Sequence, residues 1–173
     1  ATRFGYPVFN ADFVVTKLYE KDKKIFVKLK KILPKYIFSF PIQKKEISKA
    51  ILSNNSNLKK IVKVVHLEVR KKMNIFLKKN KNKKAIILDI PLLLENKINL
   101  KGDVLIFVQS NKSEIEKRLK KRRGFNLKLL RKFRNIQLPL EYKKKKSKFI
   151  IKNNFTKKSV KSEIRIVKKK LFK

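Results

Sequence analysis

A short apolar run that ends in a carboxylate constrains the fold of this chain more than any other feature. Residues Ala85–Leu88 are apolar without alternation, which is typical of a strand buried on both faces of a parallel sheet. Asp89 follows directly, and open α/β sheets bind their ligands at the carboxyl ends of such strands. The run therefore predicts a strand that presents Asp89 to a ligand or a magnesium ion, or simply a buried strand with a capping aspartate.

Composition limits the class of protein. The chain has 173 residues, of which 42% are hydrophobic, enough for one domain with a core. It contains no cysteine, which excludes disulfides, zinc–thiolate sites and thiol catalysis. No apolar run approaches the roughly 20 residues that span a bilayer, and no signal peptide is visible. We therefore expect a cytoplasmic protein without a membrane partner.

The net charge is extreme. Fifty Lys and Arg residues against 12 Asp and Glu give +38, a balance common in proteins that bind nucleic acids. The lysines are spread along the whole chain, and the abundance of Lys, Ile, Asn and Phe is also what AT-rich codon usage produces. A basic RNA- or DNA-binding protein, which would present aromatic residues beside lysines on one surface, stays an alternative. We do not expect a specific nucleic-acid partner.

The residues after Asp89 narrow the choice. Asp89–Glu95 reads D-I-P-L-L-L-E and closely resembles the D-x-P-L-L-h-E segment of dephospho-CoA kinases, the P-loop kinases of the last step of coenzyme A synthesis. Pro91 lacks an N–H and ends strand pairing, and Leu92–Leu94 are expected to form a short helix. The resemblance implies that Asp89 contacts substrate, or magnesium through water, and that Glu95 is a substrate-binding or structural residue. Another small-molecule kinase of the same fold would have no reason to share this segment.

A second segment of the family lies near the N-terminus. Gly5–Asp12 resembles the strand G-x-P-V-I-D-A-D, followed by a helix that ends near Glu20, and Ala1–Phe4 are expected to end a preceding helix. Asn10 stands where the family usually has its first aspartate, whereas Asp12 keeps the second. The resemblance implies that Asp12 is the catalytic base or the group that orients the acceptor hydroxyl. The alternative for Asp12 is a helix N-cap.

Residues 21–80 read as helical. Within them, Pro41–Ile47 resembles the family segment I-D-R-x-x-L, with Lys44 in the arginine position. Leu58–Val69 resembles L-x-x-I-x-H-P-x-V and retains the histidine as His66. In the family this insertion holds the acceptor, so the resemblance implies that Lys44 and His66 bind substrate. The alternative for His66 is a structural residue on an apolar helix face.

Two arginines mark a third matching region. Arg118 and Arg122 are four residues apart on a helix expected to run to Gly124, so they should share one face and can grip phosphate oxygens. A solvated basic face is the alternative. The family's lid opens with R-L-x-x-R and continues as Q-x-P-x-E-x-K, which Gln137–Lys143 matches. The resemblance implies that both arginines bind the nucleotide and act in catalysis, neutralising the transferring phosphoryl group.

The C-terminal third predicts two further strands and a helix. Asp103–Val108 is an apolar run that fits a buried parallel strand. Phe149–Asn154 resembles the family's last strand, A-D-x-V-I-x-N-x-G, which implies that Asn153 binds the nucleotide and puts Phe155 in the place of the glycine. Ser162–Leu171 has an apolar stripe at helical spacing and is expected to pack on the sheet.

One motif of the family is absent. A phosphate loop reads G-x-x-x-x-G-K-[ST], and none of the three glycines, Gly5, Gly102 and Gly124, precedes Lys-Ser or Lys-Thr. In the family this loop lies just upstream of the residues that match Ala1–Phe4. We therefore expect a chain that lacks its first strand and phosphate loop, with a degenerate paralogue as the alternative.

Together these patterns predict an α/β, P-loop NTPase-like three-layer parallel sheet with a helical substrate insertion and a helical lid. The predicted parts are a kinase core (1–20, 81–110 and 147–173), an acceptor-binding insertion (21–80) and a lid (111–146). The predicted reaction transfers the γ-phosphate of ATP to the 3′-hydroxyl of dephospho-CoA and uses Mg²⁺. ATP and dephospho-CoA are the expected partners.

Overall fold

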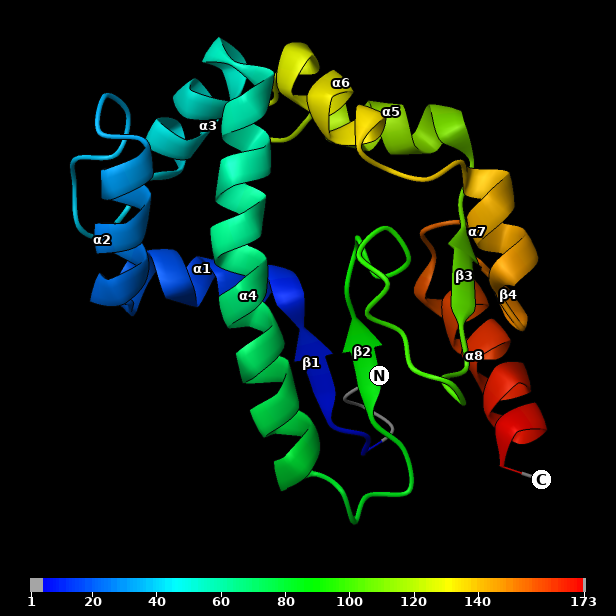
Figure 1. Ribbon diagram of the computed structural model, residues 1–173. Coiled ribbons are helices and arrows are strands. Elements are labelled where there is room, and N and C mark those ends of the chain that lie inside the picture. Colours follow the sequence, from blue (N-terminus) through cyan, green and yellow to red (C-terminus); the bar gives the residue numbers. More distant parts are fainter. Residues whose placement is uncertain (1–4, 173) are drawn as a thin grey trace. The chain divides into compact units, whose positions relative to one another are not determined.

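The computed structural model describes residues 5–172 and divides the chain into two compact units, Ala1–Pro91 and Leu92–Lys173. The helix end expected at Ala1–Phe4 lies outside the described residues. The class is α/β, as predicted, and the described strands pair in parallel (Figure 1). They form two separate pairs, β1 with β2 and β3 with β4, rather than one continuous sheet. None of the helices in residues 5–172 combines the length and apolarity that crossing a bilayer requires.

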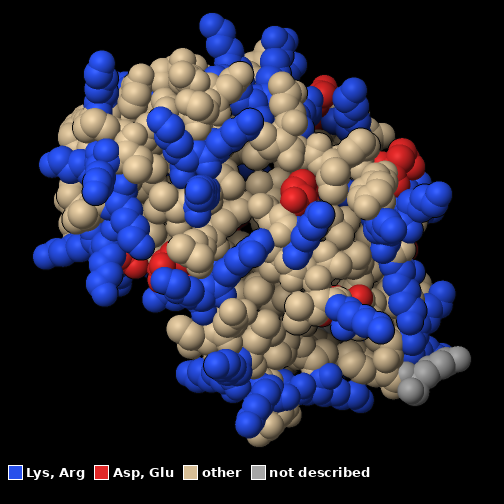
Figure 2. All heavy atoms as spheres, in the orientation of Figure 1, with Lys and Arg blue, Asp and Glu red and all other residues tan. Residues whose placement is uncertain are grey.

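On the face that Figure 2 shows, basic side chains are spread out rather than gathered in one stripe. Lys and Arg cover much of the face that Figure 2 shows, and only a few Asp and Glu lie between them. This even distribution matches the even spacing of lysines along the sequence.

The first unit holds one strand pair and the helical segment. Its strands are β1 (Val8–Asn10) and β2 (Ile87–Asp89), and Phe9 and Asn10 lie opposite Leu88 and Asp89. Its helices are α1 (Ala11–Lys21), α2 (Lys23–Ile32), α3 (Lys44–Ser53) and α4 (Asn55–Lys79). Both strands are short because β1 passes directly into α1 and Pro91 offers no N–H to extend β2.

The long helix α4 organises the core of this unit. It packs against α1, α2 and α3 and buries a stripe with helical spacing: Leu58, Ile61, Val65, Val69 and Met73. Near its C-terminal end, the ring of Phe76 lies 5.6 Å from that of Phe9 on β1, so the stripe also reaches the strand pair. The helical nature predicted for residues 21–80 is therefore confirmed except for residues 33–43, which connect α2 with α3, and the segment buries apolar surface of its own.

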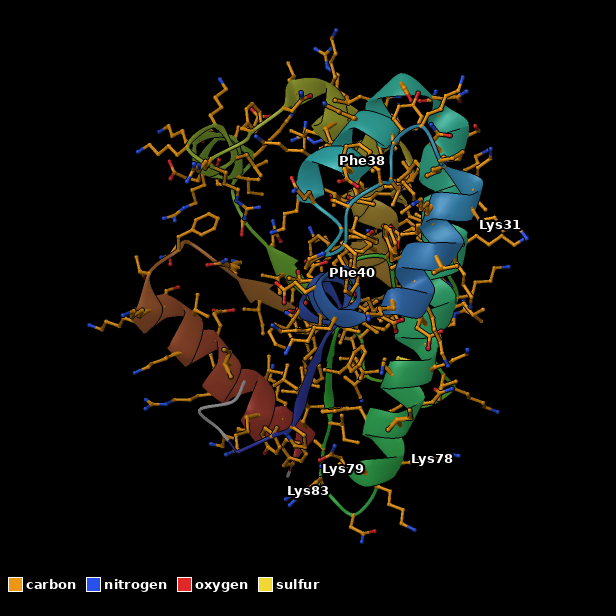
Figure 3. The ribbon with its side chains drawn as sticks, turned by 90° about the vertical axis from the view of Figure 1, so that its left-hand side faces the viewer. Lys31, Phe38, Phe40, Lys78, Lys79 and Lys83 are labelled. Carbon is orange, nitrogen blue, oxygen red and sulfur yellow. The ribbon has the colours of Figure 1, made fainter. Side chains whose placement is uncertain are left out.

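A buried carboxylate fixes the loop between α2 and α3. Glu46 is only 4% exposed, and its carboxylate accepts hydrogen bonds from the backbone N–H of Phe38 (3.1 Å) and from the hydroxyl of Ser39. Phe38 and Phe40 lie in this loop (Figure 3), and the Phe40 ring packs 5.6 Å from that of Phe26. The loop therefore has one defined conformation although Phe38 is exposed.

We expect Glu46→Ala to lower the free energy of unfolding by about 1–3 kcal/mol, because the loop loses its charged hydrogen-bond acceptor. Glu20→Ala is the matched control, since Glu20 is exposed and forms only an i,i+3 ion pair with Lys17. That variant should stay within about 0.5 kcal/mol of the parent chain. Urea unfolding followed by circular dichroism measures both, and equal losses would contradict the anchoring role of Glu46.

The second unit holds the other strand pair, in which Ile106 lies opposite Phe149. Its elements are β3 (Ile106–Gln109), α5 (Lys112–Lys120), α6 (Leu127–Asn135), α7 (Leu140–Lys146), β4 (Phe149–Lys152) and α8 (Lys157–Leu171). Helix α8 packs on β4, where Val167 and Ile151 are buried. The prediction that the C-terminal helix packs on the sheet is confirmed.

Three local predictions were wrong. Residues 85–88 are half-buried and Val108 is exposed, because a two-stranded pair cannot enclose its strands on both faces. Residues 91–97 form turns instead of the short helix expected at Leu92–Leu94, with the N–H of Asn96 bonded to the carbonyl of Leu92 (3.2 Å). Helix α5 ends at Lys120 rather than Gly124.

Candidate active site

A hydrogen bond joins the carboxyl ends of β1 and β2. The parallel register sets Asn10 opposite Asp89, and the Nδ2 of Asn10 donates to the Oδ2 of Asp89 over 2.7 Å. Two carboxylates at this distance would repel each other, whereas an amide and a carboxylate attract without a bridging proton or cation. The departure of Asn10 from the family pattern thus gives this chain a directly bonded pair at the end of its strands.

The same amide begins helix α1. The Oδ1 of Asn10 accepts the N–H of Phe13 over 2.7 Å, so Asn10 is the N-cap and Asp12 is not. The capping alternative for Asp12 is therefore wrong. Asp12 lies in the first turn of α1, where the helix dipole favours a carboxylate, and its side chain is exposed. Strand, cap and helix together place Asp12 two residues beyond the Asn10–Asp89 pair.

Asp12 also differs from most other acids of the chain, because within residues 5–172 its carboxylate has no side-chain partner. Of the 12 carboxylates, Asp12 and Glu141 are the two to which the described residues offer no side-chain hydrogen bond or ion pair. Glu141 lies on the basic helix α7, whereas Asp12 lies at the strand ends. Among the acids at the strand ends, Asp12 is therefore the one whose carboxylate stays available to a ligand.

A basic hollow lies beside this turn. It has a volume of about 860 Å³, and Phe13, the neighbour of Asp12, lines it together with residues of α1, α2 and α4. Its charged lining consists of five lysines, one aspartate and one glutamate: Lys17, Lys21, Asp22, Lys23, Lys24, Glu68 and Lys72. The hollow thus suits an anionic ligand with apolar parts.

The predicted acceptor residues lie on two helices of the same unit. Lys44 is the first residue of α3 and is exposed. His66 lies in α4, half-buried beside the buried Val65. The structure thus places both residues in the helical segment that the sequence assigned to the acceptor.

The two lid arginines do not share a helix face. Arg118 lies in the last turn of α5, and its guanidinium carbon is 4.1 Å from the centroid of the Phe155 ring. Arg122 lies beyond the helix, in a turn. Its backbone N–H donates to the carbonyl of Leu119 (3.1 Å). The predicted common face is wrong because the chain turns after Lys120 to reach Gly124, which has a φ of 76°.

Asn153 shapes the connection between β4 and α8. Its N–H donates to the carbonyl of Gln109 (2.7 Å), which extends the pairing of β4 with β3. Its Oδ1 accepts the N–H of Phe155 (2.9 Å) and so forms a tight turn before the helix. Phe155 thus contacts both Asn153 and Arg118, and no local sequence pattern predicts its contact with Arg118.

Glu95 is a structural residue. Its Oε1 accepts the Lys143 Nζ at 2.5 Å and the N–H of Leu138 at 3.0 Å, while its Oε2 is buried without a partner among the described residues. Burial alone would raise the pKa of Glu95, but the hydrogen bonds from Lys143 and from backbone N–H groups hold it below its usual value. The pair ties the turn at 91–97 to the start of α7.

We expect Lys143→Met to lower the free energy of unfolding at neutral pH by about 3 kcal/mol, because it leaves the Glu95 carboxylate buried and unpaired. The pKa of Glu95 is depressed in the folded chain, so the pair stabilises above the ordinary value of about 4.5 and loses this effect as the pH falls through the folded-state pKa. The difference between parent and variant should therefore shrink towards pH 3.

Lys117→Met is the matched control, because Lys117 pairs with Glu114 in full exposure to solvent. It should change the free energy of unfolding by no more than about 0.5 kcal/mol. Denaturation at several pH values measures both variants. A loss for Lys143→Met that stays constant down to pH 3 would show that Glu95 does not carry the effect.

Comparison with known proteins identifies the family of the chain. The family model for dephospho-CoA kinase matches residues 1–159. The dephospho-CoA kinase of Wolbachia sp. subsp. Brugia malayi is 35% identical over 164 residues, which cover 94% of this chain and 84% of that protein. The dephospho-CoA kinase of Wolbachia pipientis wMel is 34% identical over the same shares.

Two solved structures share the fold. A protein from Thermus thermophilus superposes with a TM-score of 0.72 at 23% identity, covering 99% of this chain and 88% of its own. The dephospho-CoA kinase from Campylobacter jejuni superposes with a TM-score of 0.65 at 22% identity, covering 99% and 87%. At these identities the likeness establishes the α/β fold.

Proposed function

We propose, since this chain belongs to the dephospho-CoA kinase family, that it transfers the γ-phosphate of ATP to the 3′-hydroxyl of dephospho-CoA. The observation that carries the proposal is the carboxylate of Asp12 beside the Asn10–Asp89 pair, to which residues 5–172 offer no side-chain partner. Ligands of open α/β sheets bind at this edge, so the acceptor hydroxyl would meet Asp12 there. Phosphoryl transfer needs positioning and charge neutralisation more than covalent chemistry by the protein.

Asp12 would act on the attacking hydroxyl as its base or its orienting acceptor. It is exposed and has no competing side-chain donor, so both carboxylate oxygens can accept a proton or a hydrogen bond. The Asn10 cap fixes the first turn of α1, and this turn sets the backbone position from which the Asp12 side chain extends. A general base of this kind contributes typically about 10²–10⁴-fold to a rate.

The reaction's Mg²⁺ would fit Asp89. Within residues 5–172 no group of three or more His, Cys, Asp or Glu side chains could hold a metal ion by itself. Mg²⁺ in kinases usually relies on one or two carboxylates, substrate phosphates and water, and Asp89 supplies such a carboxylate at the strand end. When bound there, the ion would neutralise charge on the phosphates.

The acceptor would be held by the helical part of the first unit, residues 21–80. The basic hollow supports this role, because dephospho-CoA carries a diphosphate and an extended, partly apolar arm. Phe13, which lines the hollow, is the next residue after Asp12 in α1. We assign Lys44 and His66 as further contacts of the acceptor, on the family resemblance of their segments.

The nucleotide would be held by residues of the second unit. We assign residues 111–146 as the lid and Arg118 and Arg122 as donors to ATP phosphates, with Asn153 near the nucleotide. Residues 1–20, 81–110 and 147–173 would form the kinase core. Arg118 supports this reading best, because its guanidinium has a fixed place and no carboxylate partner among the described residues.

The direct test of function uses two proteins. The 173 residues contain no G-x-x-x-x-G-K-[ST], so this polypeptide should bind dephospho-CoA in calorimetry but release no ADP. The loop-bearing fusion, in which a strand and a phosphate loop of that type precede Ala1, should release ADP only when dephospho-CoA is present. Turnover by the 173-residue chain would disprove the need for the loop. Failure of both proteins to bind dephospho-CoA would disprove the proposal that it is the acceptor.

In the loop-bearing fusion, Asp12→Asn should lower kcat by about 10²–10⁴-fold, because an amide cannot accept the hydroxyl proton. Its melting temperature should fall by no more than a few degrees, since Asp12 does not cap α1 and the variant loses only the interaction of the carboxylate with the helix dipole. Asp103→Asn is the matched control: Asp103 accepts only the N–H of Leu100 (2.8 Å), which an amide oxygen can also do. Unchanged kcat in Asp12→Asn would remove Asp12 from the mechanism.

A further inference from the structure

Arg118 and Phe155 form a close stack. The guanidinium carbon lies 4.1 Å from the ring centroid, at van der Waals distance. The contact joins the last turn of α5 to Phe155, which lies two residues before α8. Lysines that lie near rings elsewhere are more distant, for example Lys146 at 5.8 Å from Tyr142. A planar guanidinium can lie flat on an aromatic face, which an ammonium cannot do.

Phe155 occupies a backbone conformation that favours glycine. Its φ is +64°, in the left-handed region, where a side chain is disfavoured. The turn is held by Asn153, which accepts the N–H of Phe155, and by Asn154, whose Oδ1 accepts the N–H and the hydroxyl of Thr156. These bonds involve none of the Phe155 ring atoms, so a glycine would serve the turn better. The described contact that a glycine cannot supply is the stack on Arg118.

The donors of Arg118 are left for a ligand. Two acids lie near it on α5, but Glu114 pairs with Lys117 (3.1 Å) and Glu116 pairs with Arg134 (3.7 Å). No carboxylate in the described part of the chain forms an ion pair with Arg118. Stacking engages the face of the guanidinium and leaves its N–H groups free in the plane, where they can donate to phosphate oxygens.

We infer that Phe155 is a positioning residue for Arg118, holding the guanidinium by its face so that its edge meets the nucleotide phosphates. The inference rests on the proposed function for the identity of the ligand. A free arginine side chain populates many rotamers, and the stack removes most of that freedom before the ligand arrives. The ring therefore contributes to phosphoryl transfer through Arg118 without touching the reacting atoms.

Three substitutions separate positioning from stability. Phe155→Gly removes both the ring and the strained φ, so its melting temperature should equal or exceed that of the parent. Phe155→Leu keeps the strain without an aromatic face, and Phe155→Tyr keeps the face. Tyr142→Leu removes a ring elsewhere and serves as the control for loss of an aromatic side chain.

Two measurements, one by NMR and one of enzyme kinetics, are made on each variant. In the 173-residue chain without ligand, NMR of the Arg118 Nε–H, assigned with Arg118→Lys, should show the upfield ring-current shift in the parent and in Phe155→Tyr only. In the loop-bearing fusion, Phe155→Gly and Phe155→Leu should lower kcat by about 3- to 10-fold, the range expected for a lost cation–π contact. The KM for dephospho-CoA should not change, and Tyr142→Leu should leave the Arg118 Nε–H shift as it is in the parent.

The outcomes distinguish this inference from the function on which it rests. If the Arg118 shift survives in Phe155→Gly, or if kcat falls only in variants whose melting temperature falls, Phe155 is not a positioning residue. If the fusion shows no turnover with dephospho-CoA, the proposed function fails while the NMR result still decides whether the stack exists. Loss of the shift with unchanged kcat would overturn the link from the stack to catalysis.

Discussion

The pairing of β1 with β2, sealed by the hydrogen bond from Asn10 to Asp89, is the interaction on which the candidate site depends. The parallel register sets these two residues opposite each other at the ends of their strands. The oxygen of the same amide caps α1, because it accepts the N–H of Phe13, and so determines where the helix begins. One side chain therefore fixes both the carboxylate of Asp89 and the helical turn that carries Asp12. A residue that could only accept, or only donate, could not do both.

Acids are scarce in this basic chain, and most of its carboxylates have a visible structural role. Most of the 12 acids pair with a lysine or arginine or accept backbone N–H groups, as Glu46 and Glu95 do in buried positions. These contacts hold loops and turns in place, and the excess of lysine is spread along the sequence and over the face that Figure 2 shows. Against this background an exposed acid without a protein partner, such as Asp12, stands out as a candidate for chemistry. The charge of +38 by itself carries little information about the site.

Departures from the family pattern are informative where the structure shows what replaced the usual residue. Asn10 stands in the place of an aspartate and forms a direct bond to Asp89, which two carboxylates could form only with a proton or a cation between them. Phe155 stands in the place of a glycine, keeps a left-handed φ, and stacks on Arg118. Both replacements change the chemistry of the side chain. Both concern residues next to those expected to act on the phosphates.

The sequence by itself determined the family, the α/β class, the helical segment and the strands that end in polar residues, because each follows from short local patterns. Apolar runs and helical spacing depend on nearby residues only, so Ile87–Asp89 and the stripe of α4 were predictable. Only the tertiary structure decided that Asn10 rather than Asp12 caps α1, since both residue types cap equally well and the choice depends on where the strand releases the chain. It also decided that Glu95 pairs with Lys143 and that Arg118 meets Phe155, because contacts between residues far apart in sequence depend on the path of the chain between them.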